Sequence, residues 1–203
     1  MSNIQQKFDQ VFIEANGRED FNAEVLDQLS TLIGAGALPA VLSLPIFYGA
    51  SAKSSALIIA AAKGLDHVVE LFLRDKDLDA NAVDDEGETA LFSALMKGSK
   101  KCASLLIPRS NLSLTCDWGG SSLSLAIDNG MEEAAFSIIE RLTDEQCEHE
   151  LSGYEEGAGK KAWQPSHLSH FVQQRLLSRV EKKILCNDEA VGRGINARAR
   201  RAL

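Results

Sequence analysis

The residues of this 203-residue chain best suited to chemistry are one cysteine and three histidines in its last third: Cys147, His149, His167 and His170. Cysteine thiolate and histidine imidazole are common ligands of tetrahedral zinc, and His167 and His170 are about one helical turn apart. Neither the Cys–His nor the His–His spacing matches a zinc-binding pattern. We therefore predict no metal site and expect Cys147 to pack as a small apolar side chain, with a Cys/His metal site or enzyme as the alternative.

Catalysis without a metal also finds little support. A Cys–His pair could act as nucleophile and base, but no third partner or oxyanion-stabilising group is evident. The carboxylates of residues 84–88 lie in a turn with few apolar neighbours, so we expect them to be solvated and unsuited to acid catalysis. The chain contains neither GxxxxGK[ST] nor GxGxxG, the phosphate-binding patterns. We predict a protein that is not an enzyme and binds no cofactor.

Three segments of the chain repeat one another: residues 54–64 (SSALIIAAAKG), 88–98 (ETALFSALMKG) and 120–130 (GSSLSLAIDNG). Their final glycines are 34 and 32 residues apart. Each segment has a hydroxyl residue, a leucine two positions later and an alanine three positions after that leucine. This period indicates an array of stacked supersecondary units. The shared residues are Ser55, Leu57, Ala60 and Gly64; Thr89, Leu91, Ala94 and Gly98; and Ser121, Leu123, Ala126 and Gly130.

This pattern resembles the ankyrin-repeat family. Residues 80–92 (ANAVDDEGETALF) are similar to the turn and helix start of that family, with Asn81, Ala82, Asp84, Gly87, Thr89 and Leu91 at matching positions. The repeats are degenerate, because the family's proline is replaced by Ala56, Ala90 or Ser122 and its histidine by Ile58, Phe92 or Ser124. The resemblance covers residues 51–142, is poor over 21–50 and does not include the last quarter of the chain. It implies an all-α solenoid that binds a protein partner.

The capping residues and the apolar spacing within the segments predict the same helix pairs. In the second repeat we expect a helix capped by the Thr89 hydroxyl and ended by Gly98 in a left-handed conformation, with Ala94 small enough to let the next helix approach closely. A second helix should follow and stop at Pro108. Each pair then has an apolar face that only a neighbouring pair can cover. The residues expected inside the second helices are Val68, Val69, Leu71 and Phe72; Cys102, Leu105 and Leu106; and Ala134, Ala135, Ile138 and Ile139.

Four regions are expected along the chain. Residues 1–50 should contain a short helix over 4–14 and a divergent capping repeat with helices over 21–33 and 38–47. Residues 51–142 should form the three ankyrin-like repeats. Residues 143–186 should form a C-terminal cap with a short helix over 143–151 and a long capping helix over 166–185. Residues 187–203 form a basic tail that we expect to be disordered.

One uncharged stretch, residues 28–52, contains the apolar run LIGAGALPAVLSLPIFYGA, which is about long enough to span a bilayer. Pro39 and Pro45 would break a single helix there, so a buried helix pair explains the stretch better. The N-terminus shows no basic segment followed by an apolar one, so no secretory signal is expected. We expect a cytoplasmic protein, or one delivered to the cytosol of a host cell without such a signal.

Charge is distributed unevenly. Residues 1–157 hold 11 Lys and Arg against 26 Asp and Glu, a net charge of −15, whereas residues 158–203 hold 10 against 3, a net charge of +7. The acidic body argues against a surface devoted to nucleic acid. The basic end could bind nucleic acid or an anionic membrane, although a solvated tail is the favoured interpretation.

The resemblance implies a concave face made of the turns between repeats and the exposed ends of the first helices. An acidic rim around apolar residues would favour a partner with a basic surface. Trp118 stands out, because a tryptophan in a glycine-flanked turn either serves as a binding hot spot or folds back over its own repeat. We predict a non-enzymatic interaction module: an adaptor, an inhibitor or immunity-type protein, or an effector. The residues placed on this face are Lys63, Val83, Asp85, Glu86, Glu88, Met96, Lys97, Asp117, Trp118, Asp128 and Asn129.

Overall fold

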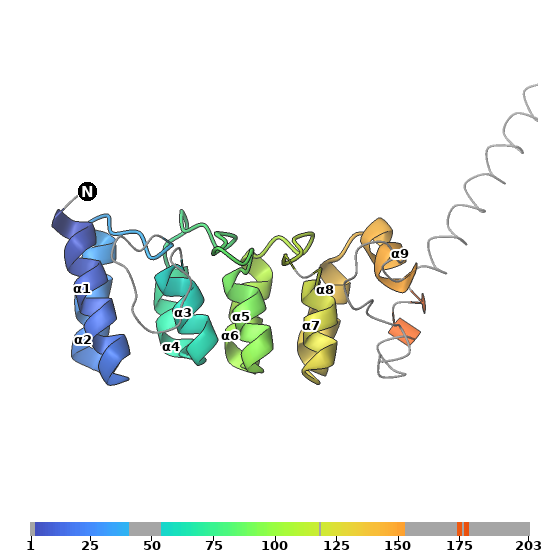
Figure 1. The fold of residues 1–203 in the computed structure, drawn as a ribbon, viewed down its shortest axis with the longest axis horizontal. Helices are drawn as coiled ribbons and strands as arrows, with labels where there is room; N and C mark the ends of the chain where they lie inside the picture. Colours follow the sequence, from blue (N-terminus) through green and yellow to red (C-terminus); the bar gives the residue numbers. More distant parts are fainter. Residues whose placement is uncertain (1–2, 41–53, 118, 153–173, 176, 179–203) are drawn as a thin grey trace, which may run out of the picture.

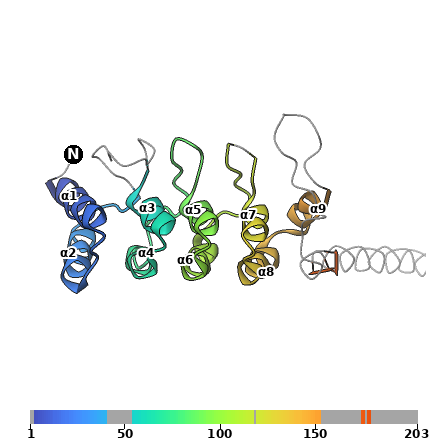
Figure 2. The ribbon, with the colours of Figure 1, turned by 60° about the horizontal axis from the view of Figure 1, so that its bottom comes forward.

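A row of paired helices makes up the computed structural model of this chain, which describes residues 3–40, 54–117, 119–152, 174–175 and 177–178 (Figure 1). Within these residues no strand is formed, and the one β-bridge joins Thr115 to Ser121. Two parallel layers of helices run along the row (Figure 2). The all-α solenoid predicted from the repeats is therefore confirmed. Its helices are α1 (Asn3–Arg18), α2 (Ala23–Gly34), α3 (Ala56–Lys63), α4 (Asp66–Leu73), α5 (Ala90–Lys97), α6 (Lys100–Leu106), η1 (Ile107–Arg109), α7 (Ser122–Asp128), α8 (Glu132–Arg141) and α9 (Asp144–Ser152).

The first helix of each repeat begins at a hydroxyl residue, as predicted. The side chains of Ser55, Thr89 and Ser121 accept hydrogen bonds from the backbone N–H three residues later, over 3.1, 3.3 and 3.0 Å. Each bond satisfies a backbone donor that has no partner within its helix. Helices α3 and α5 end at Gly64 and Gly98, both left-handed with φ of 72°, a conformation that favours glycine over residues with a Cβ.

Small and large apolar residues alternate at the contacts between repeats. The leucines and alanines that recur in the sequence are all buried, with at most 1% of each exposed. Helix α5 packs between α3 and α7 in one layer, and α6 packs between α4 and α8 in the other. An alanine at the crossing point lets two helices approach closely, because its methyl group adds little bulk. The recurring residues are Leu57, Ala60, Leu91, Ala94, Leu123 and Ala126.

The second helices supply the other half of the core. All the residues predicted to face inward there are buried, except Leu105, which is partly buried. Helix α6 ends at Leu106, but the chain continues into the short 3₁₀ helix η1, which contains Pro108. Proline is tolerated at the start of a helical turn because its missing N–H would have no partner there. Pro108 therefore lies two residues beyond the end of α6, inside η1.

The N-terminal helix is longer and more deeply buried than the 4–14 segment predicted from sequence. Helix α1 packs against α2, and Phe8 and Phe12 are fully buried. The rings of both lie within 6 Å of Phe72 on α4, at centroid distances of 5.8 and 5.9 Å. The predicted helix over 38–47 is not described as a whole, since residues 38–40 are not helical and residues 41–47 lie outside the described part.

Helix α9 follows the third repeat and confirms the short helix expected near residues 143–151. The Thr143 hydroxyl accepts a hydrogen bond from the Gln146 N–H over 3.2 Å, and the Gln146 side chain accepts one from the Thr143 N–H over 2.7 Å. This reciprocal pair is a capping box. Of the predicted long helix, residues 174–175 and 177–178 are described and helical. The 187–203 tail lies outside the described residues.

Among the helices in the described part of the chain, none has the length and hydropathy needed to cross a membrane.

Candidate partner-binding face

Two long loops project from the same side of the helix array. One loop, residues 74–89, joins α4 to α5, and the other, residues 110–121, joins η1 to α7. Both rise above the layer that contains α3, α5 and α7 (Figure 2). We call these the 74–89 loop and the 110–121 loop. Most of the face residues predicted from sequence belong to these loops or to the ends of α5 and α7.

Asp84 organises the tip of the 74–89 loop. Its Oδ1 atom accepts hydrogen bonds from the backbone N–H of Glu86 over 3.0 Å and of Glu88 over 2.9 Å. The Asp84 N–H donates in turn to the Glu88 carbonyl over 3.1 Å. Side chains that bond to backbone a few residues ahead fix turns locally. The acidic residues of this tip are therefore held on a defined backbone.

The two loops are joined by backbone contacts. The Asp117 N–H donates to the Glu86 carbonyl over 3.4 Å, and the Asn111 N–H donates to Oδ1 of Asn81 over 2.6 Å. Gly87 has φ of 71°, and a Cβ atom at Gly87 would lie 2.8 Å from Oδ1 of Asp117. The 74–89 and 110–121 loops thus form one continuous surface rather than two independent projections.

Arg109 fixes the base of the 74–89 loop. Its guanidinium donates to the carbonyl oxygens of four residues between 73 and 78, at distances from 3.0 to 3.3 Å. Arg141, 32 residues later, donates in the same way to the Pro108 carbonyl over 3.1 Å. The planar guanidinium suits this use because it presents several donors in one fixed fork. The sequence signal was this 32-residue spacing, equal to that between Gly98 and Gly130, but it was not recognised as a contact between repeats.

Two apolar side chains are exposed within this surface. Val83 at the loop tip is 49% exposed and Met96 in the last turn of α5 is 39% exposed. Elsewhere in the described part of the chain, the large apolar side chains with comparable exposure are Leu38 and Leu177. Both side chains are accessible to a partner, and their place on a binding face stays a prediction.

Acidic residues flank Val83 within the 74–89 loop. Residues 74–89 hold seven Asp and Glu against one Arg and one Lys. Asp85, Glu86 and Asp117 are exposed, and Glu88 is half-buried. Clustered charges of one sign create a local potential that attracts opposite charge and accelerates association. Among the described residues this surface is both apolar and strongly negative.

The other residues predicted for the binding face lie at helix ends or outside the described part of the chain. Lys97, Asp128 and Asn129 are exposed at the ends of α5 and α7. Lys63 is exposed too, and its Nζ donates to the Asn16 carbonyl over 3.2 Å and lies 3.7 Å from Oε1 of Glu19. Trp118 lies outside the described residues, so its role stays a prediction.

The Cys/His group is not assembled within the described part of the chain. Cys147 is buried and His149 is exposed on the same helix, as expected for positions two apart on a helix. No set of His, Cys, Asp and Glu residues in the described ranges could hold a metal ion. His167 and His170 lie outside these ranges.

One buried carboxyl group, missed in the sequence analysis, joins the cap to the third repeat. Glu150 on α9 is 7% exposed, and its Oε2 accepts a hydrogen bond from the Ser121 hydroxyl over 3.1 Å. Burial raises the pKa of Glu150 above its ordinary value of 4.5, and the Ser121 hydrogen bond and nearby His149 oppose this rise. Ser121 therefore caps α7 and holds α9 at the same time.

The sequence model described as ankyrin repeats (three copies) matches residues 39–150, more than half of the chain. The chain belongs to the ankyrin-repeat family. No curated protein matches it. Ankyrin repeats imply binding of a protein partner and are typically non-catalytic, in agreement with the exposed surface found on this array.

Proposed function

We propose that this ankyrin-repeat protein is a non-enzymatic interaction module that binds a protein partner through the concave face of the array. We define this face by the loop tips and inner helix ends around Val83 and Met96. The partner is expected to carry a basic surface with apolar side chains. Depending on that partner, the protein would act as an adaptor, an inhibitor of the immunity type or an effector.

The observation that carries this proposal is the exposure of Val83 among the acidic residues of the 74–89 loop, together with the exposure of Met96 in the last turn of α5. Burying the exposed part of each side chain against a partner would contribute about 1 kcal/mol. The surrounding carboxylates would add little net affinity, but they would steer a basic surface and discriminate against acidic ones. The inter-loop hydrogen bonds reduce the ordering cost of binding, because the loops are already held in place.

Affinity capture from a cell lysate, followed by mass spectrometry, tests this proposal with matched variants. The face variant replaces Val83→Asp and Asp85→Lys, and a second variant tests Trp118→Ala. The control replaces Glu133→Lys, a carboxylate exposed on α8 in the other layer. We expect the face variant to lose a specific partner that the control retains, with both keeping the thermal unfolding midpoint of the unmodified chain.

Two results would contradict the proposal. Equal capture by the face variant and the control would place the partner elsewhere on the molecule. A strongly lowered unfolding midpoint in the Trp118→Ala variant would show that this side chain belongs to the core of the third repeat, and it would remove Trp118 from the face.

A further inference from the structure

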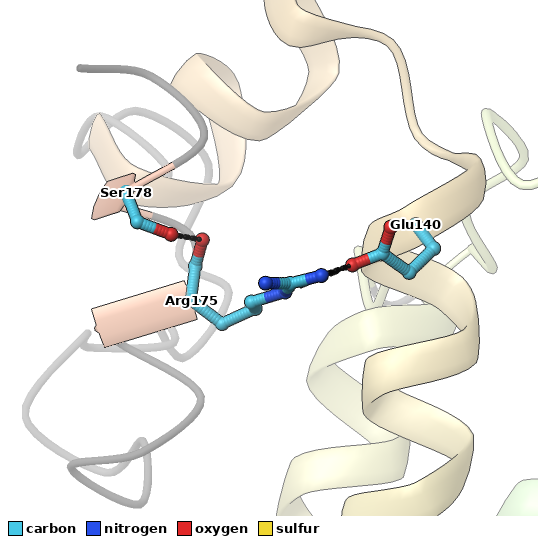
Figure 3. A network of polar contacts seen from close by, with 3 residues as sticks. All are labelled: Glu140, Arg175 and Ser178. Carbon is cyan, nitrogen blue, oxygen red and sulfur yellow. Dashed lines mark hydrogen bonds and ion pairs between the residues drawn. The ribbon is translucent and has the colours of Figure 1, made fainter. Parts of the chain in front are cut away.

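One ion pair attaches the C-terminal part of the chain to the third repeat. The Arg175 guanidinium donates to Oε1 of Glu140 on α8 from Nε over 2.8 Å, and also from Nη2 (Figure 3). The Ser178 hydroxyl donates to the Arg175 carbonyl over 2.9 Å. The remaining 25 residues of the chain follow Ser178. Their starting point is therefore next to the repeat that neighbours the acidic 74–89 loop.

The end of this segment has the composition that the concave face would recognise. Residues 190–203 (AVGRGINARARRAL) contain four arginines and no acidic residue. Arginine pairs well with carboxylates because its guanidinium can donate two parallel hydrogen bonds. The same fourteen residues also include Val191, Ile195 and Leu203, which could contact exposed apolar side chains. Both features of the face, its negative charge and its apolar centre at Val83 and Met96, have a counterpart in this segment.

The connecting chain is long enough for this contact. Eleven residues, 179–189, lie between Ser178 and this segment. A chain of eleven residues extends to roughly 36–40 Å, and as a random coil it has an end-to-end distance of about 17–20 Å. Neighbouring helices pack about 8–10 Å apart. From α8 the path to the 74–89 loop therefore crosses one repeat spacing along the array and one spacing between the two layers, and then follows the loop above α5 (Figure 2). A segment tethered at this range has an effective concentration on the order of millimolar. Individually weak Arg–carboxylate contacts can then be populated.

We propose that the arginine-rich residues 190–203 occupy the acidic concave face of their own chain and compete with the protein partner for it. This inference rests on the proposed function, since it assigns the same face two alternating occupants. The bound segment would mask Val83 and Met96 until a partner with a better-matched surface displaces it. Rising salt would weaken the internal contact, because it screens attraction between the arginines and the exposed carboxylates of the loop.

A spin label on the full chain tests the contact directly. Cys186 lies four residues before the segment, and the other three cysteines are buried, so a thiol-reactive label can be directed to Cys186. We expect broadening of the amide resonances of residues 83–88 and 96–97 that does not depend on protein concentration. The broadening should disappear in the variant that neutralises the segment: Arg193→Gln, Arg198→Gln, Arg200→Gln and Arg201→Gln.

A charge exchange provides the matched control. Reversing the charge of the 74–89 loop alone (Asp85→Arg and Glu86→Arg) should abolish the broadening. Reversing the charge of the segment alone (Arg198→Glu and Arg200→Glu) should abolish it too. Combining the two reversals should restore it. Failure of the combined variant to restore the broadening would contradict specific docking. Absence of broadening in the unmodified chain, broadening confined to α8, or broadening that grows with concentration would each overturn the proposal; the last would indicate a second copy.

A labelled synthetic peptide of residues 187–203 measures the competition. If the peptide binds the face with a Kd of roughly 100 μM, a tethered copy at about 1 mM weakens its apparent affinity about tenfold. The neutralised full chain should therefore bind the peptide about tenfold more tightly than the unmodified chain. Equal affinities would overturn the internal contact. Partner capture by the face variant and its Glu133→Lys control would still test the proposed function separately.

Discussion

Substitution of Gly87 by alanine should measure how firmly the two loops of the binding face are joined. Gly87 has φ of 71°, so a Cβ atom there costs about 1–2 kcal/mol through backbone strain. The same Cβ would lie 2.8 Å from Oδ1 of Asp117 and 3.4 Å from the Asp117 backbone nitrogen. The Asp117 carboxylate must therefore turn away, beside a backbone N–H that is hydrogen-bonded to the Glu86 carbonyl, and we expect this to cost roughly 1 kcal/mol more.

Gly98 is the matched control. It has φ of 72°, and a Cβ atom there would meet nothing within 4 Å. Gly98→Ala therefore carries the backbone strain without the contact and should cost about 1–2 kcal/mol. In thermal unfolding, each 1 kcal/mol corresponds to roughly 2–4 °C for a chain of this size. Gly87→Ala should lower the midpoint by about 2–4 °C more than Gly98→Ala does.

A double-mutant cycle with Asp117→Ala isolates the contact. Removing the Asp117 carboxylate should bring the cost of Gly87→Ala close to that of Gly98→Ala, with a coupling of about 1 kcal/mol. Hydrogen exchange at the Asp117 amide should accelerate in Gly87→Ala and not in Gly98→Ala. Equal costs of the two glycine substitutions, together with zero coupling, would refute the description of the loops as one continuous surface.

Three further substitutions test other parts of the structure. Arg109→Ala should lower the free energy of unfolding in urea by about 2 kcal/mol, because four carbonyl oxygens lose a charged donor. Arg109→Lys should not restore this stability, because an ammonium group cannot reproduce the planar fork of donors. Full restoration by lysine would contradict this role. Ala94→Leu should cost about 1–3 kcal/mol by overpacking the crossing of α3 and α5, and an unchanged midpoint would show that alanine is not needed there. Glu150→Gln should make the free energy of unfolding less dependent on pH. Because burial raises the pKa of Glu150, the stability that this group contributes is fully present below pH 4.5, and it is lost as the pH rises through the pKa of Glu150 in the folded protein. The variant should therefore match the unmodified chain near pH 4 and exceed it in thermal unfolding at pH 8, and the opposite trend would refute burial as the cause.

The repeats show which features can be predicted from a sequence alone. The capping hydroxyls, the glycines that end α3 and α5, and the buried leucines and alanines were all found from their spacing, and the structure confirms them. These features depend on residues three or four positions apart, or on one residue's own conformation. The helix type and the stacking of pairs follow because each pair leaves an apolar face that must be covered.

The pairing at the N-terminus shows the limit of that reasoning. Residues 3–18 and 23–34 pack together as α1 and α2, and Phe8 and Phe12 reach Phe72, which is about sixty residues away in the sequence. The apolar spacing predicted helices there but could not indicate which helix would cover which face. Several partners of similar hydrophobicity were available, and shape complementarity in three dimensions selected among them.

By itself the sequence determined the helical repeat, its caps and its ends, because local hydrogen bonding and the period of apolar residues decide these. Only the tertiary structure decided that Arg109 spans repeats, that Asp117 touches Glu86 and Gly87, that Lys63 is engaged by α1, and that Glu150 is buried against Ser121. These contacts join residues that are about 30 to 50 positions apart. Their formation depends on how the stacked repeats align, which leaves no local signature in the chain.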